Sequence, residues 1–202
     1  MSTRPLWYFA HESNTLRHGD NRSIVIGETH VVDGPPALCS RGLHASRRAT
    51  DALSYAPGPI VYRVRLGGAV VHGADKSCAT ERTYVAGGID AGPVLRRWSR
   101  MCALDVIHLW DAPAVVTRYL KTGDESIRAA AWDAARDARV AAWDAAWDAA
   151  RDARAAARDA AWDAAWDAAR DAARDAARDA AWERQDRRLS QMLSRAIRGA
   201  SE

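Results

Sequence analysis

The chain has 202 residues, with 29 basic and 26 acidic side chains and a formal net charge of +3 at pH 7. This modest charge nominates no partner by itself, and no stretch reaches the roughly 20 apolar residues of a membrane span. The first residues lack the apolar run of a signal peptide, and Cys39, Cys78 and Cys102 lack metal-type spacing. We therefore expect a cytoplasmic protein with reduced thiols and no membrane association.

The N-terminal part has the varied composition of a globular domain and predicts a set of short strands. Runs rich in apolar and β-branched residues lie at 6–10, 24–32, 38–44, 60–66, 69–72 and 79–85. The glycine pairs Gly67-Gly68 and Gly87-Gly88 predict turns. A short helix is expected between Ser46, as its N-cap, and Tyr55, because Pro57 stops it.

Beyond residue 88 the pattern becomes helical. Helices are predicted at 94–109 and 112–120, and Gly123 is expected to end the second of them. Ser126 is then expected to cap a much longer helix. Strands followed by helices indicate an α+β fold with a mixed head at 1–88, short connecting helices at 89–124 and one long helix at 125–198.

The long helix is predicted from a four-residue repeat, Ala-Ala-(Trp/Arg)-Asp, which fills residues 130–183. Alanine is the strongest helix former, and neither Gly nor Pro occurs between Gly123 and Gly199. A repeat of four residues exceeds the 3.6 residues of one turn, which favours a right-handed or nearly straight association of helices over a left-handed coiled coil. The sequence therefore predicts a coiled-coil-like stalk of about 70 residues.

Six tryptophans in this tract cannot be buried by a lone helix, so the tract needs a partner. Self-association is the leading interpretation, and packing against another protein or a passive expansion of a DNA repeat are the alternatives. The tail from residue 125 onward carries 15 acidic and 14 basic side chains, which argues against a membrane-surface helix and makes nucleic-acid binding an unlikely role for it. The predicted interface residues of a homo-oligomer are Trp132, Trp143, Trp147, Trp162, Trp166 and Trp182.

Motifs of common catalytic and metal sites do not occur in this sequence. The six histidines and three cysteines show no His-x-x-x-His or Cys-x-x-Cys spacing, so we expect no zinc site. The chain also has no glycine-rich phosphate loop and no Gly-x-Ser-x-Gly nucleophile elbow. From the residues alone, neither a metal nor another cofactor is expected.

Three segments of the head carry a resemblance to a small domain of phage and prophage proteins. They read GLHAS from Gly42, DALSYAPG from Asp51 and VYRVRLGG from Val61. Members of this family often carry an Ala/Trp/Arg-rich helical tail that ends in a Trp-x-Arg-Gln-like stretch, as Trp182 to Gln185 does here. The resemblance implies a phage or mobile-element context, in the cytoplasm of the host cell, and implies no particular chemistry.

The head is also similar, more distantly, to ADP-ribosyltransferase folds, because Ser46 follows a Gly-x-His pattern and precedes an Ala-Leu-x-Tyr helix. This similarity implies NAD as a cofactor, a nicotinamide pocket lined by His11, His44, Ser46 and Tyr55, and Glu81 as the catalytic carboxylate. The chain lacks the Glu-x-Glu or Gln-x-Glu pair of that family. Each of these residues also has a structural interpretation that competes with the catalytic one. His44 and Tyr55 would then be core residues, and Glu81 would be a solvated residue of a strand.

The sequence thus predicts a non-enzymatic interaction protein of phage type. Its long helix would assemble several copies, and its head would bind a host protein, as a host-defence inhibitor or an assembly accessory does. The alternative is an ADP-ribosyltransferase-like head that binds NAD or a nucleotide, carried on an oligomerising helix. Whether the protein is an enzyme stays open between these two hypotheses.

Overall fold

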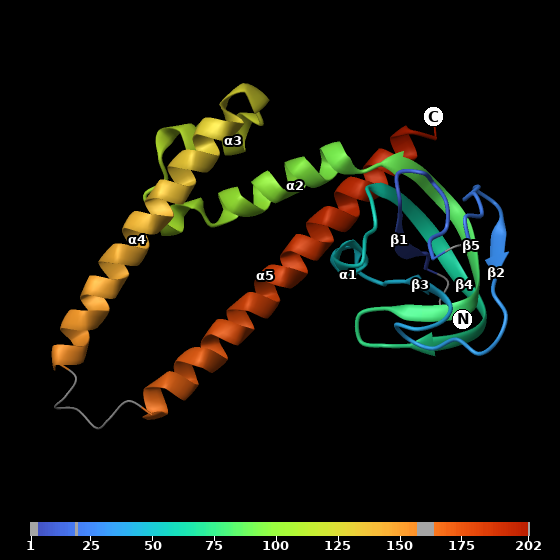
Figure 1. The fold of residues 1–202 in the computed structure, drawn as a ribbon, viewed down its shortest axis with the longest axis horizontal. Coiled ribbons are helices and arrows are strands. Elements are labelled where there is room, and N and C mark those ends of the chain that lie inside the picture. The colour runs from blue at the N-terminus through green and yellow to red at the C-terminus, as the bar shows by residue number, and fades with distance from the viewer. Residues whose placement is uncertain (1–3, 19, 157–163, 202) are drawn as a thin grey trace. The chain divides into compact units, whose positions relative to one another are not determined.

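The computed structural model describes residues 4–18, 20–156 and 164–201, and the side chains of 145–176 lie outside the description. The chain divides into two compact units, one made of Met1–Arg96 with Glu183–Glu202 and the other of Arg97–Trp182. The helices and strands are labelled in Figure 1. None of the helices in the described residues is long and apolar enough to cross a membrane.

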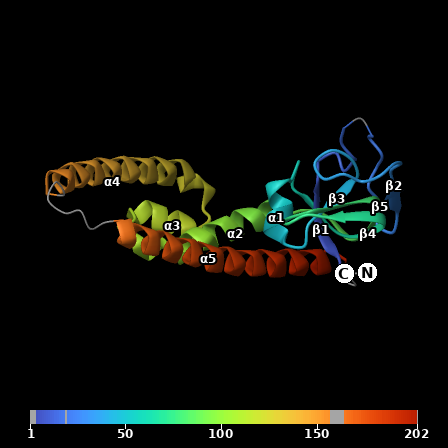
Figure 2. The ribbon, with the colours of Figure 1, turned by 90° about the horizontal axis from the view of Figure 1, so that it is seen from below.

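The first unit is built on a five-stranded antiparallel sheet. Its strands run in the order β1-β4-β5-β2, and β3 pairs with β5 beside this path. The helix α1 (Ala49–Ser54) contacts β1, as both views of the ribbon show (Figures 1 and 2). The strands are β1 (Leu6–Ala10), β2 (Thr29–Val31), β3 (Leu43–Ala45), β4 (Ile60–His72) and β5 (Ser77–Asp90).

The long hairpin of β4 and β5 corrects two predictions. The two glycine pairs were expected to form turns, but Gly67-Gly68 lies within β4 and Gly87-Gly88 lies within β5. The register of the hairpin shifts at both places, and Gly68, Gly87 and Gly88 have φ values of +64°, +116° and +77°. These glycines therefore form bulges inside continuous strands, where the positive φ is one that other residues adopt only with strain.

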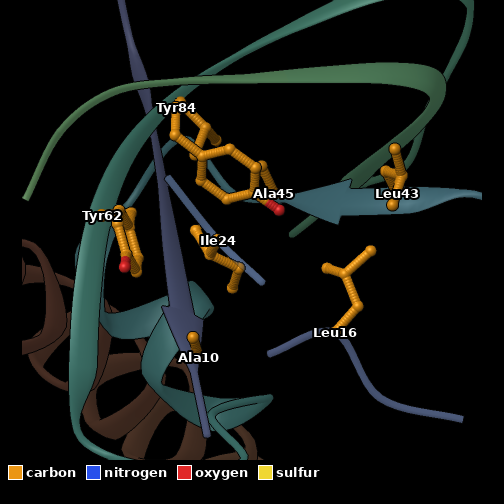
Figure 3. Packing of buried hydrophobic residues seen from close by; sticks show 8 residues of the cluster. Ala10, Leu16, Ile24, Leu43, Ala45, Tyr62 and Tyr84 are labelled. Carbon is orange, nitrogen blue, oxygen red and sulfur yellow. The ribbon is translucent and has the colours of Figure 1, made fainter. Parts of the chain in front are cut away.

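The core of the head lies against the curved face of this hairpin (Figure 3). Tyr62 and Tyr84 pack edge to face, with ring centroids 5.3 Å apart. The Tyr84 hydroxyl donates to Nδ1 of His30 at 3.1 Å, and Nε2 of His30 donates to the Ser23 carbonyl at 3.1 Å. Burial lowers the pKa of His30. This histidine is therefore a neutral core residue that orders the segment before β2.

The last turns of the chain belong to the first unit as well. In α5 (Ala164–Gly199), Leu189, Leu193 and Ile197 are buried and repeat at a spacing of four residues. Asp186, one turn earlier, accepts hydrogen bonds from the backbone N–H and the hydroxyl of Thr50 at 3.1 and 2.8 Å. The last turns of α5 run beside α1 and β1 in both views (Figures 1 and 2). The head is thus completed by residues about 100 positions beyond its strands.

The second unit contains α3 (Ala114–Thr122) and α4 (Arg128–Ala156), which contact each other. Gly123 ends α3 as predicted, with φ +70° and its N–H donated to the Tyr119 carbonyl. The chain then forms a short 3₁₀ turn, Glu125–Ile127, which Asp124 caps by accepting from the Ser126 N–H. Ser126 is therefore the capped residue and not the cap that was predicted.

The tail is described as two helices, of 29 residues in α4 and 36 residues in α5. Residues 157–163 between them lie outside the described part, so a single helix over 125–198 is not shown. The mixed α/β architecture is confirmed, with five α-helices, α1 to α5, in the described ranges. The remaining helix, α2 (Gly92–Asp105), and a 3₁₀ turn at Ile107–Leu109 precede α3. The predicted short helix of the head is confirmed in place, but it begins after Arg48, without Ser46 as its cap.

Candidate functional site

The head contains a cavity of about 660 Å³, here called the head pocket. It lies within the first unit and falls in the size range of small-molecule sites. Residues from β1, β3, α1, β5 and the loop before β3 contribute to it. Its lining includes Trp7, Tyr8, Arg41, His44, Tyr55 and Arg82.

Arg82 provides a buried positive charge at this pocket, with only 2% of its surface exposed. Its guanidinium lies 3.6 Å from the centroid of the Tyr8 ring. Nη1 donates to the His44 carbonyl at 2.8 Å, and Nη2 and Nε donate to the Tyr84 hydroxyl at 2.6 and 3.0 Å. Its hydrogen bonds thus go to neutral oxygens, and no carboxylate lies within ion-pair distance of it in the described part of the chain. An unpaired buried cation favours an anionic ligand.

His44 contributes a buried ring nitrogen to the pocket. Its Nε2 is buried and has no hydrogen-bond partner among the described residues. Burial lowers the pKa of His44, and the nearby charge of Lys76 lowers it further. At neutral pH this ring is therefore uncharged, and one of its nitrogens is available to a ligand in the pocket.

The rim of the pocket is polar and charged. Tyr55, which is half exposed, donates its hydroxyl proton to Asp75, and this hydrogen bond lowers the pKa of Asp75. The Lys76 ammonium lies 3.7 Å from the centroid of the Tyr55 ring. Lys76 and Arg41 both line the pocket, whereas its one lining carboxylate among the described residues, Asp20, is paired with Arg22 at 2.6 Å. The pocket is therefore cationic with aromatic walls.

The structure brings together three of the five predicted site residues of the head. His44, Ser46 and Tyr55 line the pocket, although Ser46 is buried and its backbone pairs with Trp7. His11 is exposed and bonds to Ser13 at 3.1 Å, outside the pocket lining. The role of Tyr55 as a core aromatic is wrong, because its side chain is 51% exposed.

Glu81 is not part of the pocket. It lies next to Arg82 on β5, paired in register with Val31 on one side and Gly67 on the other. Neighbouring residues of a strand point to opposite faces of the sheet, so Glu81 faces away from the side that Arg82 occupies. The candidate catalytic carboxylate of the transferase hypothesis is thereby separated from His44 and Tyr55.

The tryptophans of the tail form the second candidate site. Among the α4 side chains that the structure describes, 128–144, the covered or half-covered ones are those of Ala131, Ala134, Ala135 and Ala138. On the other face, Trp132 and Trp143 are 74% and 70% exposed, with Val140 between them. Asp133 and Arg136 pair at 3.6 Å, as the three-residue spacing predicts. We call Trp132, Arg136, Val140 and Trp143 the tryptophan face.

The other predicted interface residues are described only in part. Trp182, in α5, is 41% exposed. The side chains of Trp147, Trp162 and Trp166 lie outside the described residues. The structure thus places two predicted interface tryptophans on one exposed helix face.

Sequence reasoning missed Arg82, Arg41 and Lys76. The alternation of β5 places Arg82 on the same face as Tyr84, but the sequence does not say that this face is the buried one. In the described residues, no group of three or more His, Cys, Asp or Glu side chains is arranged to hold a metal ion. Comparison of the chain with protein-family models, with curated proteins and with solved structures found no match, so its function has to be argued from these two sites.

Proposed function

We propose that this chain is a non-enzymatic interaction protein of phage type, which assembles with a second copy through the tryptophan face and presents its head to a host protein. The observation that carries the proposal is the exposure of Trp132 and Trp143, at 74% and 70%, on the side of α4 away from its covered alanines. Large exposed aromatic side chains at helical spacing are typical of association surfaces.

A second copy fits this face better than a strongly charged partner does. Within 130–144 the helix carries acidic Asp133, Asp137 and Asp144 against basic Arg136 and Arg139, so it is nearly neutral. Facing copies bring Trp of one helix against Arg or Trp of the other, which suits stacking of guanidinium on indole. Alanines beside the stripe leave room for close approach.

The area available is consistent with assembly through several repeats. A tryptophan buries about 150–250 Å², so Trp132 and Trp143 of two copies together bury on the order of 600–1,000 Å². A stable interface buries about 1,200–2,000 Å², so the repeats that follow Trp143 have to take part as well. Assembly then multiplies the contacts that the heads make with their target.

Replacing Trp132 and Trp143 together by alanine is expected to weaken self-association about 100-fold, which corresponds to about 2.7 kcal/mol. Alanine keeps the helix, because it is the best helix former. Sedimentation equilibrium of the variant and of the unmodified chain measures the change. Trp110→Ala is the matched control, since Trp110 is 41% exposed but lies outside the tail. Equal association of all three chains would contradict the proposal.

A second candidate function is favoured by the head pocket itself. Its unpaired Arg82, its aromatic walls and the free Nε2 of His44 suit a ligand that carries both a ring and a phosphate. NAD and simple adenine nucleotides are ligands of this class. Because Glu81 lies outside the pocket, this candidate is a binding module and not a transferase.

Titration calorimetry with NAD and with ADP tests the second candidate. We expect binding that Arg41→Gln and His44→Gln each weaken about tenfold, through loss of one polar contact to the ligand. Glu81→Gln and His11→Gln are the controls and are expected to bind unchanged. No heat of binding at millimolar ligand would remove this candidate, and loss of binding in Glu81→Gln would contradict the placement of Glu81 outside the site.

A further inference from the structure

A second cavity of about 730 Å³ lies in the first unit, between the start of β1, the segment before α1, Arg63 near the start of β4, and the last turns of α5. Its lining is dominated by one residue type. We call it the arginine groove, after Arg4, Arg47, Arg48, Arg63, Arg187, Arg195 and Arg198. Asp186 is the one acidic residue among the described side chains that line it.

Few of these charges are neutralised within the protein. The Asp186 carboxylate is engaged by Thr50, at 2.8 Å from its hydroxyl. Arg187 pairs with Glu183 at 3.7 Å, on an exposed helix surface where such pairs contribute little. In the described part of the chain, no ion pair is formed by Arg4, Arg47, Arg48, Arg195 or Arg198.

Arg63 is the groove arginine that lies half-buried on β4. Its guanidinium lies 3.8 Å from the centroid of the Trp7 ring, and it donates a hydrogen bond to the Pro5 carbonyl. Burial, together with the smaller effect of the Arg4 charge, lowers the pKa of Arg63 to about 10. Like charges held together without counterions oppose folding, and an anion in the groove relieves that repulsion.

We propose that the arginine groove binds the phosphate backbone of a nucleic-acid strand, without reading its sequence. The planar fork of a guanidinium matches two phosphate oxygens, and seven forks along one groove match a ligand with many phosphates. A nucleic-acid strand repeats a phosphate charge about every 3.4 Å along a duplex, so several guanidinium groups lining one groove can engage successive phosphates of the same strand. Trp7 is buried, so it is not available to stack on bases.

A nucleic-acid partner for the groove differs from the expectation that the composition of the chain gives. The near-neutral tail argued against nucleic acid, and the net charge of the chain is only +3. The groove arginines come from four separate segments, at residue 4, at 47–48, at 63 and at 187–198, which only the folded head brings together. The order of charged residues along the sequence does not reveal such a cluster.

Fluorescence anisotropy with a fluorescein-labelled 20-nucleotide single strand, and with the matching duplex, tests the proposal across 50–200 mM salt. If four to six phosphates are contacted, the logarithm of the binding constant falls with the logarithm of salt with a slope of about −3 to −4 for the single strand. Arg195→Gln/Arg198→Gln is expected to bind at least tenfold more weakly and to reduce the slope by about 1.4. The two arms show which form of nucleic acid is preferred.

The matched control is Arg65→Gln/Arg184→Gln, because both arginines are exposed and neither lines the groove. The same change in net charge should leave binding within twofold of the unmodified chain. Arg47→Gln/Arg48→Gln, on the opposite side of the groove, repeats the test if the helix variant unfolds. The same titrations on Trp132→Ala/Trp143→Ala separate groove binding from assembly.

Four outcomes would overturn the inference. They are equal weakening by the control pair, a binding constant that does not change with salt, polyglutamate that binds as tightly as the oligonucleotide, and full competition by equimolar tripolyphosphate. The third would indicate an acidic protein as the partner, and the fourth a small anion.

Discussion

Leu193→Ala is expected to lower the free energy of unfolding of the head by about 2–5 kcal/mol. Leu193 is fully buried on the face of α5 that also buries Leu189 and Ile197, and it belongs to the same compact unit as the sheet. Alanine removes the buried methyl groups and leaves a cavity, so both the transfer and the cavity cost apply. Urea unfolding followed by circular dichroism measures the change.

Leu109→Ala is the matched control, because Leu109 is 72% exposed and the substitution removes the same atoms. It should change the free energy of unfolding by less than about 0.5 kcal/mol. A small effect of Leu193→Ala would mean that the end of α5 does not complete the head. Because the end of α5 belongs to the head core, a chain that lacks the tail would also lose part of that core. Point variants of the full chain therefore test assembly better than a truncated chain does.

Gly87→Ala is expected to lower the free energy of unfolding by about 3 kcal/mol or more. Gly87 has φ +116°, and a Cβ atom there would lie 2.3 Å from the Val61 carbonyl oxygen and 2.7 Å from the Tyr62 Cα. Both neighbours are backbone atoms of the paired strand, so no side-chain rotation relieves the contact. The bulge holds Tyr62 in the core, and its loss loosens the packing of Tyr62 against Tyr84.

Thermal and urea unfolding of Gly87→Ala beside Gly199→Ala give the comparison. At Gly199 no atom lies within 4 Å of an added Cβ, so that variant should unfold like the unmodified chain. If both variants were equally stable, β5 would not carry the bulge at this position.

Local patterns predicted the elements that local chemistry determines. The first strand at 6–10 matches β1, Gly123 ends α3, and the alanine-rich tract is helical wherever it is described. In the hairpin, the prediction of turns from the two glycine pairs was wrong. Paired glycines are typical of turns, but whether they form a bulge instead depends on the partner strand. The pairing of β4 with β5 decides that outcome, and it is not a local property.

The candidate sites likewise contain residues that a local sequence pattern identifies and residues that only the folded chain brings together. His44 and Ser46, which the Gly-x-His-x-Ser pattern singled out, line one pocket, because β3 and the segment after it are adjacent in sequence. Arg82 and Arg41 come from distant segments, and the arginine groove combines both ends of the chain. Such sites depend on which strand faces are buried and on where α5 ends, and neither can be derived from spacing alone.

The mass of the unmodified chain in solution, measured by light scattering over a range of concentrations, tests the central claim most directly. Assembly through the tryptophan face predicts a mass that rises with concentration from 22.1 kDa toward a whole multiple of that value. A constant mass of 22.1 kDa up to high micromolar concentration would contradict the claim.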